Sequence, residues 1–250
     1  MTKTALITGA SSGIGKATAI KLAECGYDLI LCGRRAEKLE ELKNTLSKIV
    51  NVCTLVFDVR NREDVELQLN SLLNEWKNID VLVNSAGNAH GMAPIHTADI
   101  EDWDAMIDSN VKGLLYVSKA TIPQMVERKK GHIINLSSIA GKQTYTNGAV
   151  YCASKKAVEA ISEGMRLDLT EHGIKITNIA PGAVETEFSE VRFKGDIERA
   201  KKVYEGYEPL RAEDVADVIV YAINTPERVI IADVVIYPKA QSAPTTIYRK

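Results

Sequence analysis

The fold is decided by Thr4-Ala5-Leu6-Ile7 and the stretch that follows it, Thr8-Gly9-Ala10-Ser11-Ser12-Gly13-Ile14-Gly15. A strand-like apolar run leads directly into a glycine-rich turn, and the turn opens a helical pattern that runs through Lys21-Leu22-Ala23. Glycines in such a turn let backbone N–H groups approach a pyrophosphate, whose charge the helix N-terminus stabilises. The stretch therefore predicts the first unit of a dinucleotide-binding sheet. The alternative, a glycine-rich turn without a ligand, is disfavoured by its place directly after the first strand.

Length and composition suit one soluble globular domain. The 250 residues are 45% hydrophobic and 26% charged, with a net charge of −2, and this near-average usage disfavours disordered and membrane classes. No apolar run approaches the roughly 18 residues of a spanning helix. Met1-Thr2-Lys3-Thr4 leads into a strand rather than into a secretory signal. We therefore expect a cytoplasmic protein that binds neither nucleic acid nor membrane.

The cysteines and histidines show no metal-binding spacing. Cys25, Cys32, Cys53 and Cys152 contain no C-x-x-C pair, and the four histidines are scattered. We expect buried, reduced thiols and no bound metal.

Short β-rich runs alternate with helical patterns along most of the chain. Near-continuous apolar strands between amphipathic helices are typical of a parallel sheet covered on both faces. For residues 1–250 we predict an α/β fold: a single-domain, Rossmann-type, doubly wound parallel sheet of about seven strands. Right-handed crossovers then bring the loops after the strands to one edge, where such sheets bind ligands. The predicted strands are Thr4–Ile7, Leu29–Cys32, Cys53–Phe57, Val81–Val83, Ile133–Leu136, Ile174–Thr177 and Val234–Ile236.

Two segments interrupt this alternation. Residues 185–208 are charged, contain Gly195 and Gly206, and precede a helix that Arg211 begins. Their length exceeds that of an ordinary connection, which predicts a substrate lid. The C-terminal tail, residues 238–250, is short and polar, and two possibilities stay open for it: disorder, or docking on a neighbouring subunit.

The end of the second strand indicates which dinucleotide binds. A ribose-binding carboxylate is expected near Gly33, yet the sequence there reads Cys32-Gly33-Arg34-Arg35. Two guanidiniums can instead pair with a 2′-phosphate through charge-assisted hydrogen bonds. We therefore predict NADP rather than NAD, against the alternative that Arg34 and Arg35 only decorate a helix start.

Two further loops fit the same ligand. Asp58 and Val59 follow the third strand, where the carboxylate can accept a hydrogen bond from the adenine amino group. Asn84, Ala86 and Gly87 follow the fourth strand and allow a close backbone approach near the ribose. Asp58 is equally suited to cap the next helix, and Asn84 to satisfy strand edges.

Tyr151 and Lys155 predict the chemistry. Residues four apart share a helix face, so the Lys155 ammonium lies beside the Tyr151 phenol, and its charge lowers a pKa that is ordinarily near 10. Ser138, from another segment, can hold a carbonyl oxygen against that phenol. This arrangement predicts proton transfer by Tyr151, against the alternative of an ordinary solvated helix face.

Taken together, the motifs resemble the short-chain dehydrogenase/reductase family in content and order over about the whole chain. They are the glycine loop, Asn84-Ser85-Ala86-Gly87, Asn110, Ser138, Tyr151-x-x-x-Lys155 and Pro181-Gly182-Ala183-Val184-Glu185-Thr186.

The resemblance implies a role for each matched position. Tyr151 would be the general acid in carbonyl reduction, with Ser138 orienting the substrate oxygen. Lys155 would hold the nicotinamide ribose, and Asn110 would bend its helix and position a water between Lys155 and solvent. Pro181 and Gly182 belong to the nicotinamide segment, in which Val184 would meet the carboxamide and Thr186 the adjacent phosphate. The family also implies a homotetramer.

The segment from Thr186 to Asp196 and the ending Val235-Ile236-Tyr237-Pro238 resemble the branch of NADP-dependent 3-hydroxy acid dehydrogenases, which includes serine and allo-threonine dehydrogenases. Arg192 can pair with a substrate carboxylate or can be a surface guanidinium. The expected reaction is hydride transfer between NADP and the 3-hydroxyl or 3-oxo group of such small molecules, including 3-hydroxypropionate and malonic semialdehyde. The alternatives are a broad carbonyl reductase or 3-oxoacyl reductase, and a non-catalytic NADP-binding scaffold or sensor.

Overall fold

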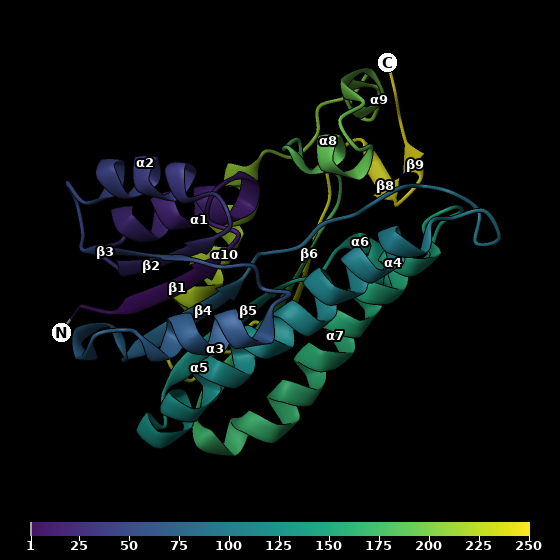
Figure 1. Ribbon diagram of the computed structural model, residues 1–250. Coiled ribbons are helices and arrows are strands. Elements are labelled where there is room, and N and C mark those ends of the chain that lie inside the picture. The colour runs from purple at the N-terminus through teal and green to yellow at the C-terminus, as the bar shows by residue number, and fades with distance from the viewer. Residues whose placement is uncertain (1) are drawn as a thin grey trace.

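A seven-stranded parallel sheet organises the protein. The computed structural model describes residues 2–250 (Figure 1). Its sheet has the order β3-β2-β1-β4-β5-β6-β7, which confirms the predicted fold class. The strands are β1 (Thr4–Thr8), β2 (Asp28–Gly33), β3 (Val52–Val56), β4 (Ile79–Asn84), β5 (Gly131–Leu136), β6 (Ile174–Pro181) and β7 (Asp233–Ile236).

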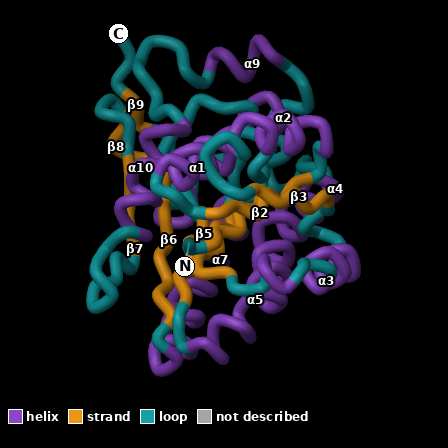
Figure 2. The backbone as a smooth tube through the Cα atoms, turned by 90° about the vertical axis from the view of Figure 1, so that its left-hand side faces the viewer, coloured by secondary structure: helices purple, strands orange, loops and turns teal. Residues whose placement is uncertain are grey.

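Helices cover both faces of the sheet, as Figures 1 and 2 show. One layer contains α1 (Gly13–Glu24), α2 (Ala36–Leu46) and α10 (Ala212–Ile223), and the other contains α3 (Arg62–Asn70), α5 (Leu114–Arg128) and α7 (Ala149–Leu169). None of the helices in residues 2–250 is long and apolar enough to cross a bilayer. The shorter helical elements are η1 (Asn74–Trp76), α4 (Ile100–Ile107), η2 (Asp108–Gly113), α6 (Ile139–Lys142), η3 (Thr170–His172), α8 (Phe188–Arg192) and α9 (Ile197–Lys202).

The two helical layers explain why the strands are mostly apolar on both faces. Successive side chains of a strand point to opposite faces, so Ile7 packs in the core on the α1 side and Leu6 in the core on the α5 side. The buried polar strand residues, such as Asn84 and Asn135, form hydrogen bonds inside the protein. Cys32 is buried in the second core, whereas Cys25 is exposed, contrary to the expectation that the thiols are buried.

The strand order reverses beside β1. The chain runs outward from β1 to β2 and β3, and β4 then returns to the other side of β1. Loops leaving the carboxyl ends of β1 and β4 therefore diverge, and such a reversal point opens a crevice that binds ligands in doubly wound sheets.

Residues 185–208, the lid segment, contain α8 and α9, which lie beside the sheet edge (Figure 1). The C-terminal tail forms an antiparallel hairpin of β8 (Gln241–Ala243) and β9 (Thr246–Ile247). Its last residue reaches the lid segment, where the Lys250 N–H donates to the Gly206 carbonyl at 2.8 Å. The tail thus packs on its own chain rather than being disordered, and docking on a neighbouring subunit stays a prediction.

Candidate active site

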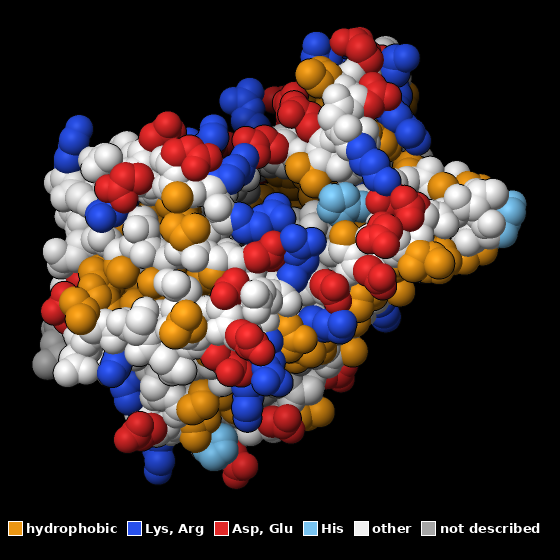
Figure 3. All heavy atoms as spheres, viewed as in Figure 1, with side chains coloured by type: hydrophobic (Ala, Val, Ile, Leu, Met, Phe, Trp, Pro, Cys, Tyr) orange, Lys and Arg blue, Asp and Glu red, His pale blue; other side chains and the backbone are white. Residues whose placement is uncertain are grey.

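A groove of about 330 Å³ lies at the carboxyl edge of the sheet. Figure 3 shows basic side chains gathered beside a hollow with an apolar floor, between the main body and the protruding α8–α9 region. Most of the predicted cofactor positions line this groove, and the exceptions are Gly15 and Asn84. Those that line it are Gly9, Ser11, Ser12, Gly13, Ile14, Arg34, Arg35, Asp58, Val59, Ala86, Gly87, Tyr151, Lys155, Pro181, Gly182, Val184 and Thr186.

The glycine loop has the backbone that a pyrophosphate site needs. Gly9 and Gly13 have φ values of +67° and +51°, in the left-handed region that favours glycine. Gly15 has a different role, because a Cβ there would lie 2.4 Å from the Gly9 carbonyl oxygen. It lets α1 pack against the loop rather than touching a ligand. Since the N-terminus of α1 faces the groove, these residues fit a dinucleotide phosphate.

Three arginines surround the end of the groove beyond the glycine loop. Arg35 donates to the Ser11 hydroxyl and pairs with Glu187 at 2.8 Å, so it joins the glycine loop to the lid segment. Arg34 lies 3.6 Å from Asp58, and Arg60 pairs with the same carboxylate at 2.7 Å. A phosphate at this end would meet an electropositive surface. Arg60 was not among the predicted residues, although a basic residue two positions after Asp58 could have indicated it.

The Asp58 carboxylate faces the groove and forms ion pairs with Arg34 and Arg60. Burial alone would raise the pKa of Asp58, yet the Arg60 hydrogen bonds and the Arg60 and Arg34 charges lower it overall. The carboxylate does not cap α3, because Asn61 accepts hydrogen bonds from the Glu63 and Asp64 N–H groups. An ionised acceptor is therefore available at the predicted adenine position.

Asn84 itself does not line the groove, so the backbone approach near the ribose stays a prediction for this residue. Its side chain is buried beneath the groove and donates to Ser118 Oγ at 3.0 Å and to Asn135 Oδ1 at 2.9 Å. Asn84 joins β4 to β5 and α5, which is the structural alternative raised from the sequence. Ala86 and Gly87 do line the groove.

Ser138, Tyr151 and Lys155 converge on the groove from two segments. Ser138 follows β5 and caps α6, with its hydroxyl accepting from the Ala140 N–H at 3.1 Å. Tyr151 and Lys155 lie in the first two turns of α7, which the predicted helix face requires. Lys155 Nζ donates to the Leu136 carbonyl oxygen at 2.9 Å. The arrangement brings a hydroxyl, a phenol and an amine to one place.

The electrostatics of this cluster differ from the expectation. Burial raises the pKa of the Tyr151 phenol, Tyr145 raises it further, and the hydrogen bond with Ser138 and the charge of Arg192 only partly oppose this. Burial also lowers the pKa of Lys155 to about 8. Desolvation therefore dominates the pKa shifts of both groups. The Tyr151 pKa is raised rather than lowered here, and its lowering by Lys155 together with a bound nucleotide stays a prediction.

Asn110 lies behind the groove rather than in its wall. It sits in the π-helical turn η2 between α4 and α5, where its Oδ1 accepts from the Asn88 N–H at 2.8 Å and its Nδ2 donates to the Asn88 carbonyl at 2.8 Å. A Cβ on Gly87 would lie 2.9 Å from Asn110 Oδ1 and 3.4 Å from Lys155 Nζ. The three residues are therefore neighbours, and Asn110 supports the loop that faces Lys155.

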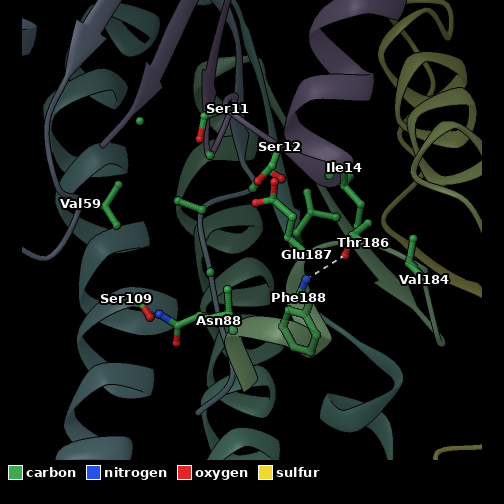
Figure 4. Close-up of a pocket in the computed structure, with 18 of the residues that line it drawn as sticks. Ser11, Ser12, Ile14, Val59, Asn88, Ser109, Val184, Thr186, Glu187 and Phe188 are labelled. Carbon is green, nitrogen blue, oxygen red and sulfur yellow. Dashed lines mark hydrogen bonds between the residues drawn. The ribbon is translucent and has the colours of Figure 1, made fainter. Parts of the chain in front are cut away.

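Several groove residues were not predicted. Figure 4 shows Asn88 and Ser109 on one side and Glu187 and Phe188 on the other, with Glu187 extending toward Ser12. Ser109 directly precedes Asn110, and Phe188 follows Thr186 closely, so proximity to predicted motifs was the available indication. The residues missed are Gly33, Phe57, Arg60, Ser85, Asn88, Ser109, Leu136, Ser137, Glu187, Phe188 and Val191.

Arg192 lies apart from the main groove. It lines a second, smaller cavity of about 30 Å³ that it shares with Tyr151. Other residues around that cavity include His90, Trp103 and Met106. Tyr151 therefore lines both the groove and this second cavity.

Known proteins share this fold and these motifs. A family model described as short chain dehydrogenase matches residues 3–196. The NADP-dependent 3-hydroxy acid dehydrogenase YdfG of Salmonella typhi is 46% identical over 238 residues, covering 95% of both proteins. A protein named NADP-dependent 3-hydroxy acid dehydrogenase from Schizosaccharomyces pombe is 42% identical over 251 residues, covering 99% of this chain and 97% of that protein.

A solved structure agrees with these relatives. The closed form of serine dehydrogenase complexed with NADP+ matches with a TM-score of 0.93 and 43% identity, covering 99% of this chain and 100% of that chain. A doubly wound sheet with a serine, a tyrosine and a lysine at its carboxyl edge defines a nucleotide-dependent dehydrogenase or reductase. The chain belongs to the short-chain dehydrogenase/reductase family and is an oxidoreductase that acts on CH–OH groups.

Proposed function

We propose that this NADP-dependent oxidoreductase interconverts the 3-hydroxyl and 3-oxo groups of small hydroxy acids, of the serine, allo-threonine and 3-hydroxypropionate type. The names of its relatives support this substrate class. The observation that carries the proposal is the environment of Arg192.

Within residues 2–250, Arg192 is a cation that has no acidic partner and lies beside the Tyr151 ring. Its guanidinium lies 5.4 Å from the centroid of the Tyr151 ring and 5.6 Å from that of Tyr145. Its Nη2 donates to the Tyr145 hydroxyl at 2.6 Å, and its buried Nε has no hydrogen-bond partner in residues 2–250. No carboxylate in that part of the chain lies within 4.0 Å of the guanidinium.

A buried donor without a partner is costly, and a guanidinium matches a carboxylate in charge and geometry. A carboxylate of the substrate supplies both missing features: the negative charge and an acceptor for Nε. Because Arg192 and Tyr151 share a cavity, a 3-hydroxy acid whose carboxylate Arg192 holds would bring its C3 hydroxyl, separated from the carboxylate by one carbon, toward the phenol. The small volume of that cavity favours a short substrate.

Tyr151, Ser138 and Lys155 have different roles in the proton transfer. The raised pKa keeps the Tyr151 phenol protonated before reaction, so it can donate its proton to a carbonyl oxygen that Ser138 holds. Lys155 places an amine, and below pH 8 a cation, at the ribose side of the groove. When NADP is bound it supplies the hydride chemistry, and the protein aligns the substrate with it.

The test is a substrate screen on the native enzyme and an Arg192→Gln variant. We expect turnover of serine, allo-threonine and 3-hydroxypropionate with NADP⁺, with KM rising about 100-fold in the variant because a desolvated charged hydrogen bond is lost. Serinol, which has no carboxylate, should show little change between the two enzymes. Arg199→Gln is the matched control, since Arg199 lies in the same segment and stacks on Phe193.

An Arg192→Gln enzyme that keeps its KM for the hydroxy acids would contradict the carboxylate role. Preference for an acetoacetyl thioester over every free acid would support a 3-oxoacyl reductase instead. Binding of NADPH without turnover of any carbonyl would support a non-catalytic scaffold.

The lid segment belongs to the same proposal. Its contacts with the body include the hydrogen bond from the Gly91 N–H to the Arg192 carbonyl at 2.9 Å and the ion pair between Lys194 and Asp102 at 2.8 Å. Movement of this segment would carry Arg192 toward or away from Tyr151. We therefore expect substrate binding to slow proteolysis within residues 185–208.

A cytoplasmic homotetramer completes the proposal. Ile100 on α4, Leu115 on α5 and Leu167 on α7 are exposed large apolar side chains on the helices that follow β4 and β5. Such faces favour association with further copies of the chain. Light scattering during gel filtration would test this, and a monomeric mass would contradict it.

A further inference from the structure

The segment Gly182–Glu185 is held in place by hydrogen bonds from the backbone of two residues and from the side chains of two others. The Gly182 N–H donates to the Ile236 carbonyl at 2.7 Å, which continues the pairing of β6 with β7. Leu210 forms two backbone hydrogen bonds with the residues that follow. Its N–H donates to the Ala183 carbonyl at 3.0 Å, and its carbonyl accepts from the Glu185 N–H at 2.8 Å. The segment is therefore fixed as a short extended strand along the groove.

Gln241, in the C-terminal hairpin, is the first side chain that anchors this segment. Its Oε1 accepts from the Ala183 N–H at 2.9 Å, and the side chain is buried, with 7% of the residue exposed. It fits there because Gly182 has no side chain: a Cβ at that position would lie 2.4 Å from the same Oε1. The tail thus reaches back across the end of β6 to satisfy one particular backbone donor.

Tyr204, in the lid segment, is the second side chain that anchors this segment. Its hydroxyl donates to the Val184 carbonyl at 2.9 Å and lies 2.7 Å from Ser189 Oγ. Since the single phenol proton is used toward Val184, the Ser189 hydroxyl donates to the Tyr204 oxygen. Burial raises the pKa of Tyr204, so this donor stays protonated.

One backbone N–H of the segment, that of Val184, has no hydrogen-bond acceptor within the described residues, although the N–H groups on both sides of it are paired. Val184 lines the groove (Figure 4). Unpaired backbone donors at a partly buried position need an acceptor from outside the chain. The amide oxygen of a nicotinamide carboxamide is such an acceptor.

We propose that Gln241 and Tyr204 are positioning residues that fix the peptide of Val184, so that its N–H orients the nicotinamide end of the cofactor. The inference rests on the proposed binding of NADP in the groove. Gln241 holds the peptide on its N-terminal side, and Tyr204 holds the carbonyl on its C-terminal side. Neither side chain lines the groove itself.

The tail supports both anchors. Besides carrying Gln241, it donates from Arg249 Nη2 to the Val203 carbonyl at 3.1 Å and from the Lys250 N–H to the Gly206 carbonyl at 2.8 Å. These contacts flank Tyr204. The C-terminal tail therefore connects the nicotinamide end of the groove with the lid segment.

The test compares two ligands that differ only at the nicotinamide. Dissociation constants for NADPH and for 2′-phospho-ADP-ribose, which lacks the nicotinamide, are measured for native enzyme, Gln241→Met and Tyr204→Phe. We expect each variant to bind NADPH about 10-fold more weakly, as the loss of one oriented hydrogen bond implies. Binding of 2′-phospho-ADP-ribose should change less than about 2-fold, because its contacts lie at the other end of the groove.

Conservative and matched variants separate positioning from folding. Gln241→Glu keeps an acceptor oxygen and should restore NADPH affinity to within about 3-fold of native. Tyr248→Phe, a change at an exposed tyrosine of the same tail, should leave both affinities unchanged.

Equal weakening of both ligands, or no weakening of either, overturns the positioning role. If Gln241→Met does not fold, Tyr204→Phe decides, since it removes a single oxygen. Failure of the native enzyme to bind NADPH would instead contradict the proposed function, so the two failures are distinct.

Discussion

Lys155 Nζ donates a hydrogen bond to the carbonyl oxygen of Leu136 at 2.9 Å, which ties α7 to the end of β5. The amine is nevertheless buried, and burial lowers its pKa to about 8. One of its three protons is used by Leu136, and the amine also lies close to Gly87 at the groove wall. A costly buried cation is thus kept where the cofactor ribose is expected.

Replacing Lys155 by Met should therefore stabilise the fold while reducing activity. The folded pKa of about 8 lies below the ordinary 10.5, so the unfolded chain holds this proton more tightly. The cost is fully present below pH 8 and disappears as pH rises from about 8 to 10.5. We expect the variant to gain about 1–3 kcal/mol at pH 7 and the gap to close near pH 10.5. Urea unfolding at both pH values measures this, and an equal gap at both would contradict it.

Replacing Tyr151 by Phe should lower kcat by about 10³-fold, since the proton donor is lost. NADPH affinity should stay within about 3-fold, because the ring keeps its packing against Phe188 at a centroid distance of 5.8 Å. Steady-state kinetics and fluorescence titration check both. Tyr221→Phe, at an exposed tyrosine of α10, is the control. Retained turnover would remove Tyr151 from the proton transfer.

Replacing Arg35 by Ala should change the choice of cofactor. Loss of a guanidinium facing the 2′-phosphate should lower kcat/KM with NADP by about 10- to 100-fold and alter the value with NAD by much less. Arg62→Ala is the control, since Arg62 is exposed and pairs at 3.5 Å with Glu66 on its own helix. Equal losses with both cofactors would mean that Arg35 acts by holding the Ser11 loop rather than by reading the phosphate.

His132 should make the fold sensitive to acid. Burial lowers the pKa of His132 to about 3 from the ordinary 6.5, and its Nε2 lies 2.8 Å from Thr177 Oγ1. The unfolded chain takes up this proton first, so stability is lost as pH falls from 6.5 toward 3. At pH 5 the loss should be about 2 kcal/mol.

A His132→Gln variant should lose that part of the acid sensitivity. The measurement is the difference between urea midpoints at pH 7 and pH 5, and His96→Gln, at an exposed loop position, should behave as native. Parallel pH profiles for native protein and His132→Gln would sink this prediction.

The strands and motifs could be predicted because their causes are local. Apolar runs such as Leu29–Cys32 indicate strands that are covered on both faces, and the missing ribose carboxylate near Gly33 indicates NADP without reference to any distant residue. Tyr151 and Lys155 could be placed on one face because four residues make about one helical turn.

Other properties depend on residues far apart in the sequence. Asn84 belongs to the core because Ser118 and Asn135 reach it. Gln241 reaches the Gly182–Glu185 segment only because the C-terminal tail folds back to Ala183, 58 residues earlier. Neither contact leaves a pattern in the sequence around the residue itself.

The amino-acid sequence by itself thus determined the doubly wound sheet, the cofactor class and the serine, tyrosine and lysine of the site, since periodicity, glycine geometry and residue chemistry act over a few positions. Only the tertiary structure decided the directions in which burial shifts the pKa values of Tyr151 and Lys155, the lack of a hydrogen-bond partner for Arg192 Nε within residues 2–250, and the anchoring of Val184. The physical reason is that desolvation and hydrogen-bond partners depend on what surrounds a group in space, which burial by distant segments sets.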